Sequence, residues 1–271
     1  MADLTWLFER GPLPLLVSMP HVGTQVPPAL ARRLTPAALT LADTDWHLPQ
    51  LYNFLQDLGA NLLVAVNSRY LIDLNRDPDG TPLYPGADNT ELCPTSTALW
   101  ELIYLDGQAP DAAEVAERTA LYWQPYHTKL AETLADLRAR HGYALLFDAH
   151  SIKSVLPRYF NGRLPDINFG SADGSSAAPD IPESMLAAAR RFSDYSAVLN
   201  GRFKGGYITR AHGRPQASIH AVQLELAWRT YMDEDVCTAG RFELDESRAQ
   251  GLRPLLRAAI DAMLAQAQAR Y

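Results

Sequence analysis

Short apolar runs alternate with longer segments of helical spacing along most of the chain. Four runs are typical of buried strands because apolar side chains fill consecutive positions: 13–18 (LPLLVS), 61–67 (NLLVAVN), 143–147 (YALLF) and 220–226 (HAVQLEL). A fifth run, YLIDL at 70–74, also fits a strand. We therefore expect at least five strands.

The segments between these runs carry helical patterns. Apolar residues recur at helical spacing in 36–58, 111–141, 183–195 and 245–268, and Pro125 predicts a break or kink in the second. Strands that alternate with long helices predict an α/β fold with a mostly parallel, mixed sheet flanked by helices. No linker-like segment divides the chain, so we expect one domain over residues 1–271.

Two segments, 77–97 and 157–182, are rich in turn-forming residues and are expected to be long loops. Loops of this length in a compact domain often act as lids or binding loops.

Composition narrows the classes of partner. Hydrophobic residues make up 47% of the 271 residues and charged residues 20%, a globular balance. The net charge of -7 argues against nucleic acid or an anionic membrane as a partner. No apolar run is long enough to span a bilayer, and residues 1–10 do not resemble a secretory signal. Cys93 and Cys237 cannot build a disulfide framework, so a cytoplasmic location is expected.

Polar side chains follow several of the predicted strands. His21 follows LLVSMP, His150 follows LLFDA, and Glu225 stands within AVQLELA. Ligands of open α/β sheets bind beyond the carboxyl ends of the strands, where side chains from distant segments meet. We expect a functional site there.

The two histidines suit a metal centre. Asp148 precedes His150 by two residues on the same strand face, where its carboxylate can hold the imidazole tautomer. The alternative is a strand-end cap or a buried polar pair. His21, in SMPHVGT, would alone be read as a histidine that hydrogen-bonds a loop.

A metal centre of the catalytic zinc type needs a third ligand, commonly a carboxylate. The DTDWH segment at 43–47 offers Asp43 and Asp45, with Asp45 preferred. Capping of a helix start explains these acids equally well.

Glu225 is a candidate general base, because a buried carboxylate must face a cation, a metal-bound water or solvent. Its alternative is a strand-edge ion pair with Arg229.

Arg69, Asn75 and Arg76 form a candidate carboxylate clamp, since guanidinium binds both carboxylate oxygens. Arg69 and Arg76 would face opposite sides of a regular strand, so a turn between them is required. Weak surface salt bridges are the alternative. Arg210, after the glycine turn 205–206, adds another cation.

Taken together, these segments resemble the N-formylglutamate amidohydrolase family, the deformylases of histidine breakdown. The matching stretches follow the family's order over nearly the whole chain: SMPHVGT (18–24), DTDWH (43–47), SRYLIDLNR (68–76), WQPYH (123–127), DAHSIKS (148–154), NGRFKGGYITRAHG (200–213) and HAVQLELAWRTYMDE (220–234).

The resemblance implies hydrolysis of N-formyl-L-glutamate, a small dianion, to L-glutamate and formate. It implies a divalent ion, zinc by expectation, held by His21, Asp45 and His150, with Glu225 as the base. The two substrate carboxylates would bind at the arginine cluster that includes Arg210, and the oligomeric state stays open.

The family is in turn similar to the zinc carboxypeptidases, whose phosphorylase/hydrolase-like fold is expected here. Those enzymes supply the acidic ligand three residues after the first histidine, where this chain has Thr24. Two other functions stay open. One is a related metallohydrolase acting on another N-acyl amino acid or a peptide C-terminus. The other is a catalytically silent binding protein for acidic amino acids.

Overall fold

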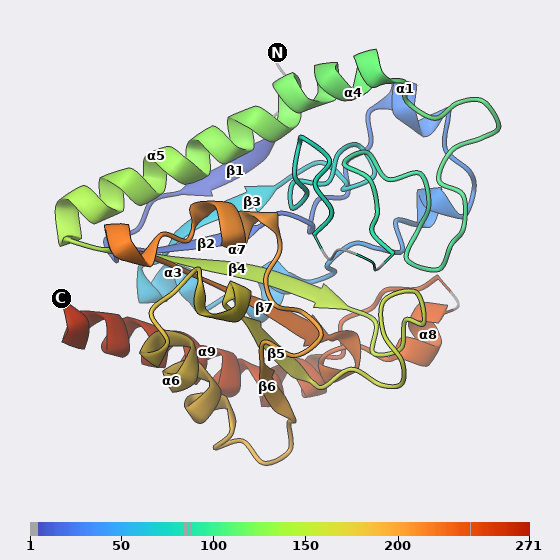
Figure 1. The fold of residues 1–271 in the computed structure, drawn as a ribbon. Coiled ribbons are helices and arrows are strands. Elements are labelled where there is room, and N and C mark those ends of the chain that lie inside the picture. Colours follow the sequence, from blue (N-terminus) through green and yellow to red (C-terminus); the bar gives the residue numbers. More distant parts are fainter. Residues whose placement is uncertain (1–4, 84–85, 87, 239) are drawn as a thin grey trace.

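Seven strands of the computed structural model form a single mixed sheet in the order β1-β3-β2-β4-β7-β5-β6 (Figure 1). The structure describes residues 5–83, 86, 88–238 and 240–271. The strands are β1 (Trp6–Glu9), β2 (Leu15–Met19), β3 (Asn61–Ala65), β4 (Ala144–Ile152), β5 (Ile167–Gly170), β6 (Ala197–Leu199) and β7 (Ile219–Ala227).

The sheet is mostly parallel, as the sequence predicts. β2 pairs in parallel with β3 and β4, β4 with β7, and β5 with β6. β1 and β5 run antiparallel to their neighbours β3 and β7. The four runs predicted as buried strands, 13–18, 61–67, 143–147 and 220–226, are confirmed as β2, β3, β4 and β7. Strand β4 continues through His150 to Ile152.

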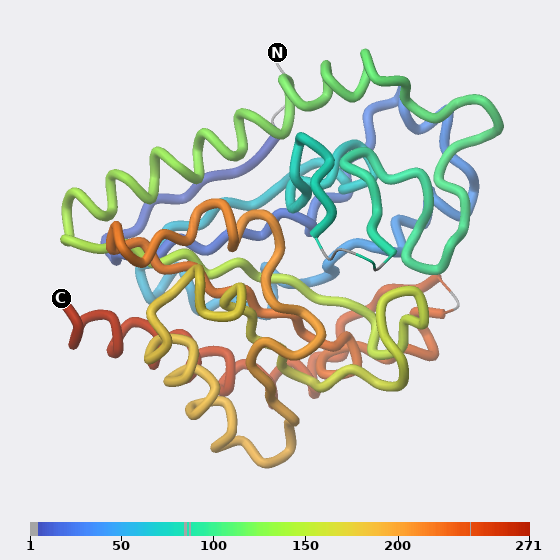
Figure 2. Tube along the Cα trace, viewed as in Figure 1, coloured from blue at the N-terminus to red at the C-terminus, as the bar shows by residue number. Residues whose placement is uncertain are grey.

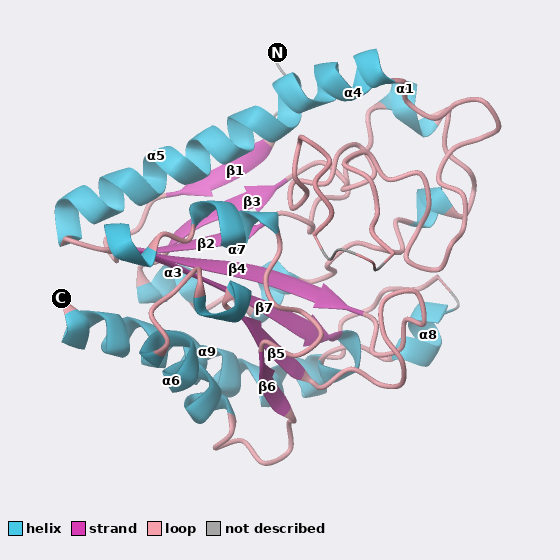
Figure 3. Ribbon diagram, viewed as in Figure 1, coloured by secondary structure: helices cyan, strands magenta, loops and turns pink. Residues whose placement is uncertain are grey.

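Helices cover both faces of this sheet (Figures 1 and 3). The α-helices are α1 (Pro28–Ala31), α2 (Leu48–Leu51), α3 (Leu55–Leu58), α4 (Ala112–Arg118), α5 (Gln124–His141), α6 (Asp180–Ala189), α7 (Tyr207–His212), α8 (Glu234–Thr238) and α9 (Glu246–Arg270). Short helical turns lie at η1 (Ala38–Thr40), η3 (Ala172–Gly174), η4 (Pro215–Ala217) and η5 (Trp228–Thr230), and a π-type turn, η2 (Thr119–Trp123), joins α4 to α5. None of the described helices is long and apolar enough to cross a membrane.

Alternate side chains of the central strands build two separate cores, one on each face. Leu146 of β4 packs in the same cluster as Leu130 of α5, whereas the adjacent Phe147 packs with Leu256 of α9. This follows from the two-residue period of a strand. Asp148 and His150 continue the period of Leu146, so their side chains belong to the α5 face.

Two predicted elements are wrong. Segment 36–58 is not one helix, because Leu41 and His47 adopt left-handed backbone conformations between η1 and α2, and α2 ends at the cap residue Tyr52 before α3 begins. Segment 70–74 is a turn instead of a strand, with the Leu71 amide bonded to the Ser68 carbonyl at 2.9 Å. Its apolar side chains are buried because the turn packs into the core beside α5.

The long helical segment 111–141 runs on through Pro125. Pro125 lies in the first turn of α5, directly after the π-type turn, where the chain accommodates a residue without an amide hydrogen. The strands β1, β5 and β6 were not predicted. β5 lies inside the predicted loop 157–182, whereas the described part of 77–97 has no helix or strand element.

Candidate metal centre and its cavity

The two histidines meet at one edge of the sheet because β2 and β4 are parallel neighbours. His21 follows the end of β2, and His150 lies near the end of β4, with ring centroids 4.8 Å apart. Both rings are buried. The strand ends point toward the loops formed by residues 66–83 and 88–110 (Figures 1 and 2).

Asp45 lies between the two imidazoles. Its amide donates to the carbonyl of His21 at 3.0 Å, which fixes the turn before α2 against the end of β2. Its Oδ2 atom is 3.0 Å from His150 Nδ1 and 3.8 Å from His21 Nδ1. One potential ligand atom from each of the three residues lies within 4.8 Å of the others, and all three residues are buried.

Asp43, the other candidate ligand, points elsewhere. Its Oδ2 atom accepts a hydrogen bond from the Ala98 amide at 2.9 Å. The helix-capping alternative is also wrong, because α2 begins after His47 with no side-chain cap.

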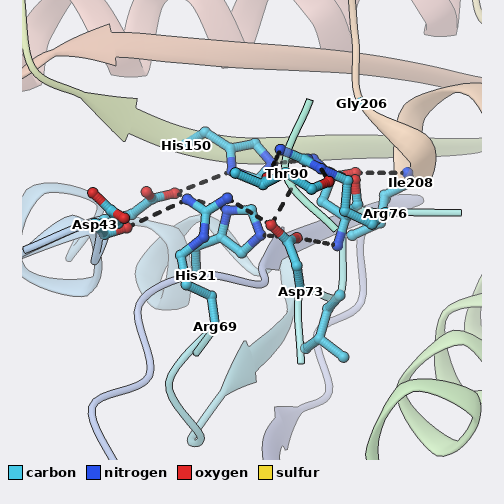
Figure 4. Close-up of polar contacts among 12 residues, drawn as sticks. His21, Asp43, Arg69, Asp73, Arg76, Thr90, His150, Gly206 and Ile208 are labelled. Carbon is cyan, nitrogen blue, oxygen red and sulfur yellow. Dashed lines mark hydrogen bonds and ion pairs between the residues drawn. The ribbon is translucent and has the colours of Figure 1, made fainter. Parts of the chain in front are cut away.

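A second carboxylate holds the far side of each imidazole. Asp73 Oδ1 is 2.7 Å from His21 Nε2 (Figure 4). Asp148 Oδ2 is 3.0 Å from His150 Nε2. Each Nδ1 atom therefore faces Asp45. A carboxylate behind each imidazole is the arrangement that orients histidine ligands of metals. The donor set fits a divalent ion of the zinc type, with two imidazoles and one carboxylate.

The charges around the histidines are strongly coupled. Burial opposes ionisation of Asp73, but Arg69 and His21 bring the pKa of its carboxyl well below the ordinary value. Burial also lowers the pKa of His150, yet Asp148 and Asp45 together raise that pKa well above its ordinary value. The carboxylates of Asp45, Asp73 and Asp148 surround the two imidazoles with negative charge, which favours a bound cation.

Sequence reasoning missed Asp73. It stands in the apolar YLIDL run and is buried. The signal was the same one that singled out Glu225, a carboxylate in an otherwise apolar segment. An ordinary strand pattern in this run gives no reason to expect a carboxylate that faces the site.

The turns of segment 66–76 bring the guanidinium groups of Arg69 and Arg76 to the same carboxylate oxygen, as the clamp hypothesis requires. Arg69 Nη2 donates to Asp73 Oδ2 at 2.6 Å, and Arg76 Nη1 lies 3.7 Å from the same oxygen. Arg76 Nη2 also donates to Thr90 Oγ1 at 2.9 Å. These are not surface salt bridges, because the Asp73 side chain has no exposed area.

Asn75 connects this segment to the strand edge. Its Nδ2 atom lies 3.1 Å from His150 Nε2, and its Oδ1 atom accepts from the Ile208 amide at 2.8 Å. A Cβ atom at Gly206 would come within 2.2 Å of Asn75 Nδ2. Only glycine at 206 lets α7 approach closely enough to hold Asn75 beside the metal ligands.

Glu225 lies beside the centre. β4 and β7 pair in register, so His150 stands directly opposite Glu225. Gln223 Nε2 donates to Glu225 Oε2 at 3.2 Å. Burial raises the pKa of Glu225 to about 8. The alternative, an ion pair of Glu225 with Arg229, is wrong, because Arg229 forms an ion pair with Asp166 at 2.7 Å.

All predicted site residues except Arg210 line one cavity of about 100 Å³. Residues of both long loops, among them Ser96 and Tyr159, also line it. Arg210 is not part of the described lining: its side chain is exposed and its Nε donates to the Gly205 carbonyl at 2.9 Å. The structure therefore does not bring Arg210 together with Arg69 and Arg76.

A family model described as N-formylglutamate amidohydrolase matches residues 13–232, which include every residue of the centre. The chain belongs to the N-formylglutamate amidohydrolase family. Two curated relatives are both named N-formylglutamate deformylase. The protein from Pseudomonas aeruginosa is 48% identical over 264 residues, 97% of each chain. The protein from Pseudomonas putida is 46% identical over 269 residues, 99% of each chain.

One solved structure agrees with this assignment to the family, and a second shares the fold. The N-formylglutamate amidohydrolase from Ralstonia eutropha JMP134 aligns with a TM-score of 0.78 and 25% identity, covering 100% of this chain and 99% of its own. A gene product of Agrobacterium tumefaciens shares the fold with a TM-score of 0.68 and 18% identity, covering 98% and 95%. The similarity to zinc carboxypeptidases stays a prediction.

Proposed function

We propose that this amidohydrolase cleaves N-formyl-L-glutamate to L-glutamate and formate with the help of a divalent metal ion. One observation carries the proposal. The Nδ1 atoms of His21 and His150 both face Asp45 Oδ2, and Glu225 lies in register with His150. The names of the two Pseudomonas relatives support the choice of substrate.

We assign the metal ligands to His21, Asp45 and His150, and zinc is the ion that this donor set favours. Asp73 and Asp148 would fix the two imidazoles in the orientation that binds it. When bound, such an ion lowers the pKa of a coordinated water to about 7 and polarises the amide oxygen.

Glu225 is proposed as the general base. Burial raises the pKa of its carboxyl toward neutral pH, and a carboxylate whose pKa lies closer to the working pH transfers protons in both directions more effectively. Glu225 would take the proton from the attacking water and pass it to the leaving amine. Gln223 holds the carboxylate in place through its side-chain amide.

Arg69, Asn75 and Arg76 are proposed to bind a substrate carboxylate. Arg69 is already bonded to Asp73, so it fixes the position of the segment, whereas Arg76 is held by the Thr90 hydroxyl at the cavity wall. The net charge of -7 disfavours a dianionic substrate, and local cations offset that repulsion.

We place the reaction in histidine breakdown, in keeping with the family resemblance, and in the cytoplasm. The two cysteines support a reducing compartment, since both are buried and unbridged.

A formate-release assay on N-formyl-L-glutamate tests the proposal. We expect activity in the zinc-loaded protein, loss of activity with a chelator, and recovery after zinc is added back. Absence of formate release from the zinc-loaded protein would refute the proposed substrate. Full activity in protein shown to be metal-free would refute the metal dependence.

A further inference from the structure

A cationic side chain of the cavity has no role in the scheme above. Lys153 lines the cavity three residues after His150, in the DAHSIKS segment. Its Nζ atom lies 5.8 Å from the ring centroid of Trp228, which also lines the cavity. An aromatic face stabilises an ammonium group without neutralising its charge.

Lys153 differs from Arg69 and Arg76 in that no acidic side chain among the described residues pairs with its charge. Arg69 is paired with Asp73 at 2.6 Å, and Arg76 lies 3.7 Å from the same carboxylate. Lys153 forms no ion pair with any acid in the described part of the chain. The positive charge of Lys153 therefore remains available to an anion in the cavity.

N-formylglutamate presents two carboxylates separated by three carbon atoms, so one guanidinium pair cannot bind both. Arg69 and Arg76 converge on a single oxygen of Asp73, and Arg210 is exposed outside the cavity lining. One of the two carboxylates thus needs another cation.

Geometry separates the two carboxylates. Asn75 lies 3.1 Å from His150, so the arginine cluster adjoins the metal ligands. The α-carboxylate carbon is two bonds from the amide nitrogen, and the side-chain carboxylate carbon is four. The α-carboxylate therefore belongs at the arginine cluster. Lys153 lines the same cavity as that cluster, so the two can contact one small substrate together.

We propose that Lys153 binds the side-chain carboxylate of the substrate and sets the preference of the enzyme for an acidic acyl amino acid. The inference rests on the proposed function, since it names a contact with the same substrate. Lys153 acts here as a specificity-determining residue, outside the set of metal ligands and bases.

Lys153→Met tests this role, because methionine keeps an unbranched chain and removes the charge. We expect kcat/KM for N-formylglutamate to fall about 10- to 100-fold, mainly through KM. The value for N-formylglutamine, which keeps the α-carboxylate but has an uncharged side chain of similar shape, should change less than about threefold. Lys153→Arg should retain the preference for the acid. Equal loss on both substrates with zinc retained would mean a structural role and overturn the proposal.

Two further variants sharpen the experiment. Lys129→Met is the matched control: its Nζ atom also lies over a ring, 3.8 Å from the Phe8 centroid, but Lys129 is outside the cavity lining. It should leave both substrates unaffected. Arg202 lines the cavity too and donates from Nε to the Tyr159 carbonyl. Loss of selectivity in Arg202→Met, with none in Lys153→Met, would assign the contact to Arg202 and overturn the proposal.

A binding measurement separates this inference from the proposed function. Calorimetric titration of the zinc-loaded wild type with L-glutamate and L-glutamine should show tighter binding of glutamate, and Lys153→Met should remove the difference. This readout needs no turnover. Absence of formate release would refute the proposed function, whereas an unchanged glutamate preference in Lys153→Met would refute the role of Lys153.

Discussion

Asp73 Oδ1 lies 2.7 Å from His21 Nε2, while Asp73 Oδ2 accepts from Arg69 Nη2 at 2.6 Å. The backbone amide of Asn75 donates to Asp73 Oδ1 as well, at 2.8 Å. One buried carboxylate therefore orients the proposed metal ligand His21 and two residues of the proposed carboxylate clamp, Arg69 and Asn75.

Asp73→Asn should weaken zinc binding by about 10- to 100-fold, the usual cost of losing a carboxylate behind a metal-bound imidazole. Asparagine preserves the shape but leaves Arg69 without its ionised partner. Competition with a chromophoric chelator measures the affinity. Asp43→Asn is the comparison, since Asp43 is half-buried nearby but bonded to the Ala98 amide. Wild-type affinity in Asp73→Asn would contradict this orienting role.

Glu225→Gln should lower kcat by about 10²- to 10⁴-fold, the range expected for loss of a general base. The amide is isosteric and leaves the ligands His21, Asp45 and His150 in place, so zinc content should equal that of the wild type. Steady-state formate release and metal analysis of the same preparation measure both. A variant with full activity would remove Glu225 from the mechanism.

Arg76→Ala should reduce kcat/KM for N-formylglutamate much more than for N-formyl-4-aminobutyrate, which lacks the α-carboxylate. A charge-assisted hydrogen bond contributes about 1.5–3 kcal/mol, so a loss of about 10- to 100-fold is expected on the first substrate. Arg76→Lys should recover part of it, because lysine keeps the charge without the planar fork. Equal losses on both compounds would argue against binding of the α-carboxylate at Arg76.

Acid should destabilise the folded chain through His127. Burial lowers its pKa to about 3, below the ordinary value of 6.5, so the unfolded chain binds the proton first. The contribution is fully present above pH 6.5 and is lost as the pH falls from there toward 3. It changes by at most about 1.4 kcal/mol per pH unit.

Urea unfolding between pH 7 and pH 5 measures this slope. His127→Gln should have the shallower dependence, whatever its absolute stability, because the titrating group is gone. Buried histidines elsewhere add to the wild-type slope, since burial lowers the pKa of His220 to about 4. Parallel curves for the wild type and His127→Gln would show that His127 does not titrate as described.

The sequence predicts those site residues whose positions are fixed by the ends of strands. His21 and His150 follow apolar runs of parallel, adjacent strands, so their convergence follows from the topology. The two-residue spacing of Asp148 and His150 likewise predicts their hydrogen bond. Asp45 was preferred to Asp43 without a geometric reason, and the reason is the bond from its amide to the His21 carbonyl.

Tertiary packing decides what the sequence does not predict. Asp73 occupies an apolar run that folds as a turn, so a strand pattern gave no indication that its carboxylate faces His21. Arg210 follows a glycine turn, but Ile208 of the same short helix packs into the core beside α5, and Arg210 is exposed. The edge strand β6 has only half-buried residues and too few of them to show a period.

The amide of Asp45 is bonded to the carbonyl of His21, so two of the three proposed ligands share one piece of backbone although 23 positions separate them in the chain. A mutation that shifts this junction would displace both donors together. Metal affinity would then fall in one step, with no stable intermediate in which a single donor has been lost. Screens for weakened metal retention should therefore recover substitutions in the intervening chain as severe as those at the donors themselves.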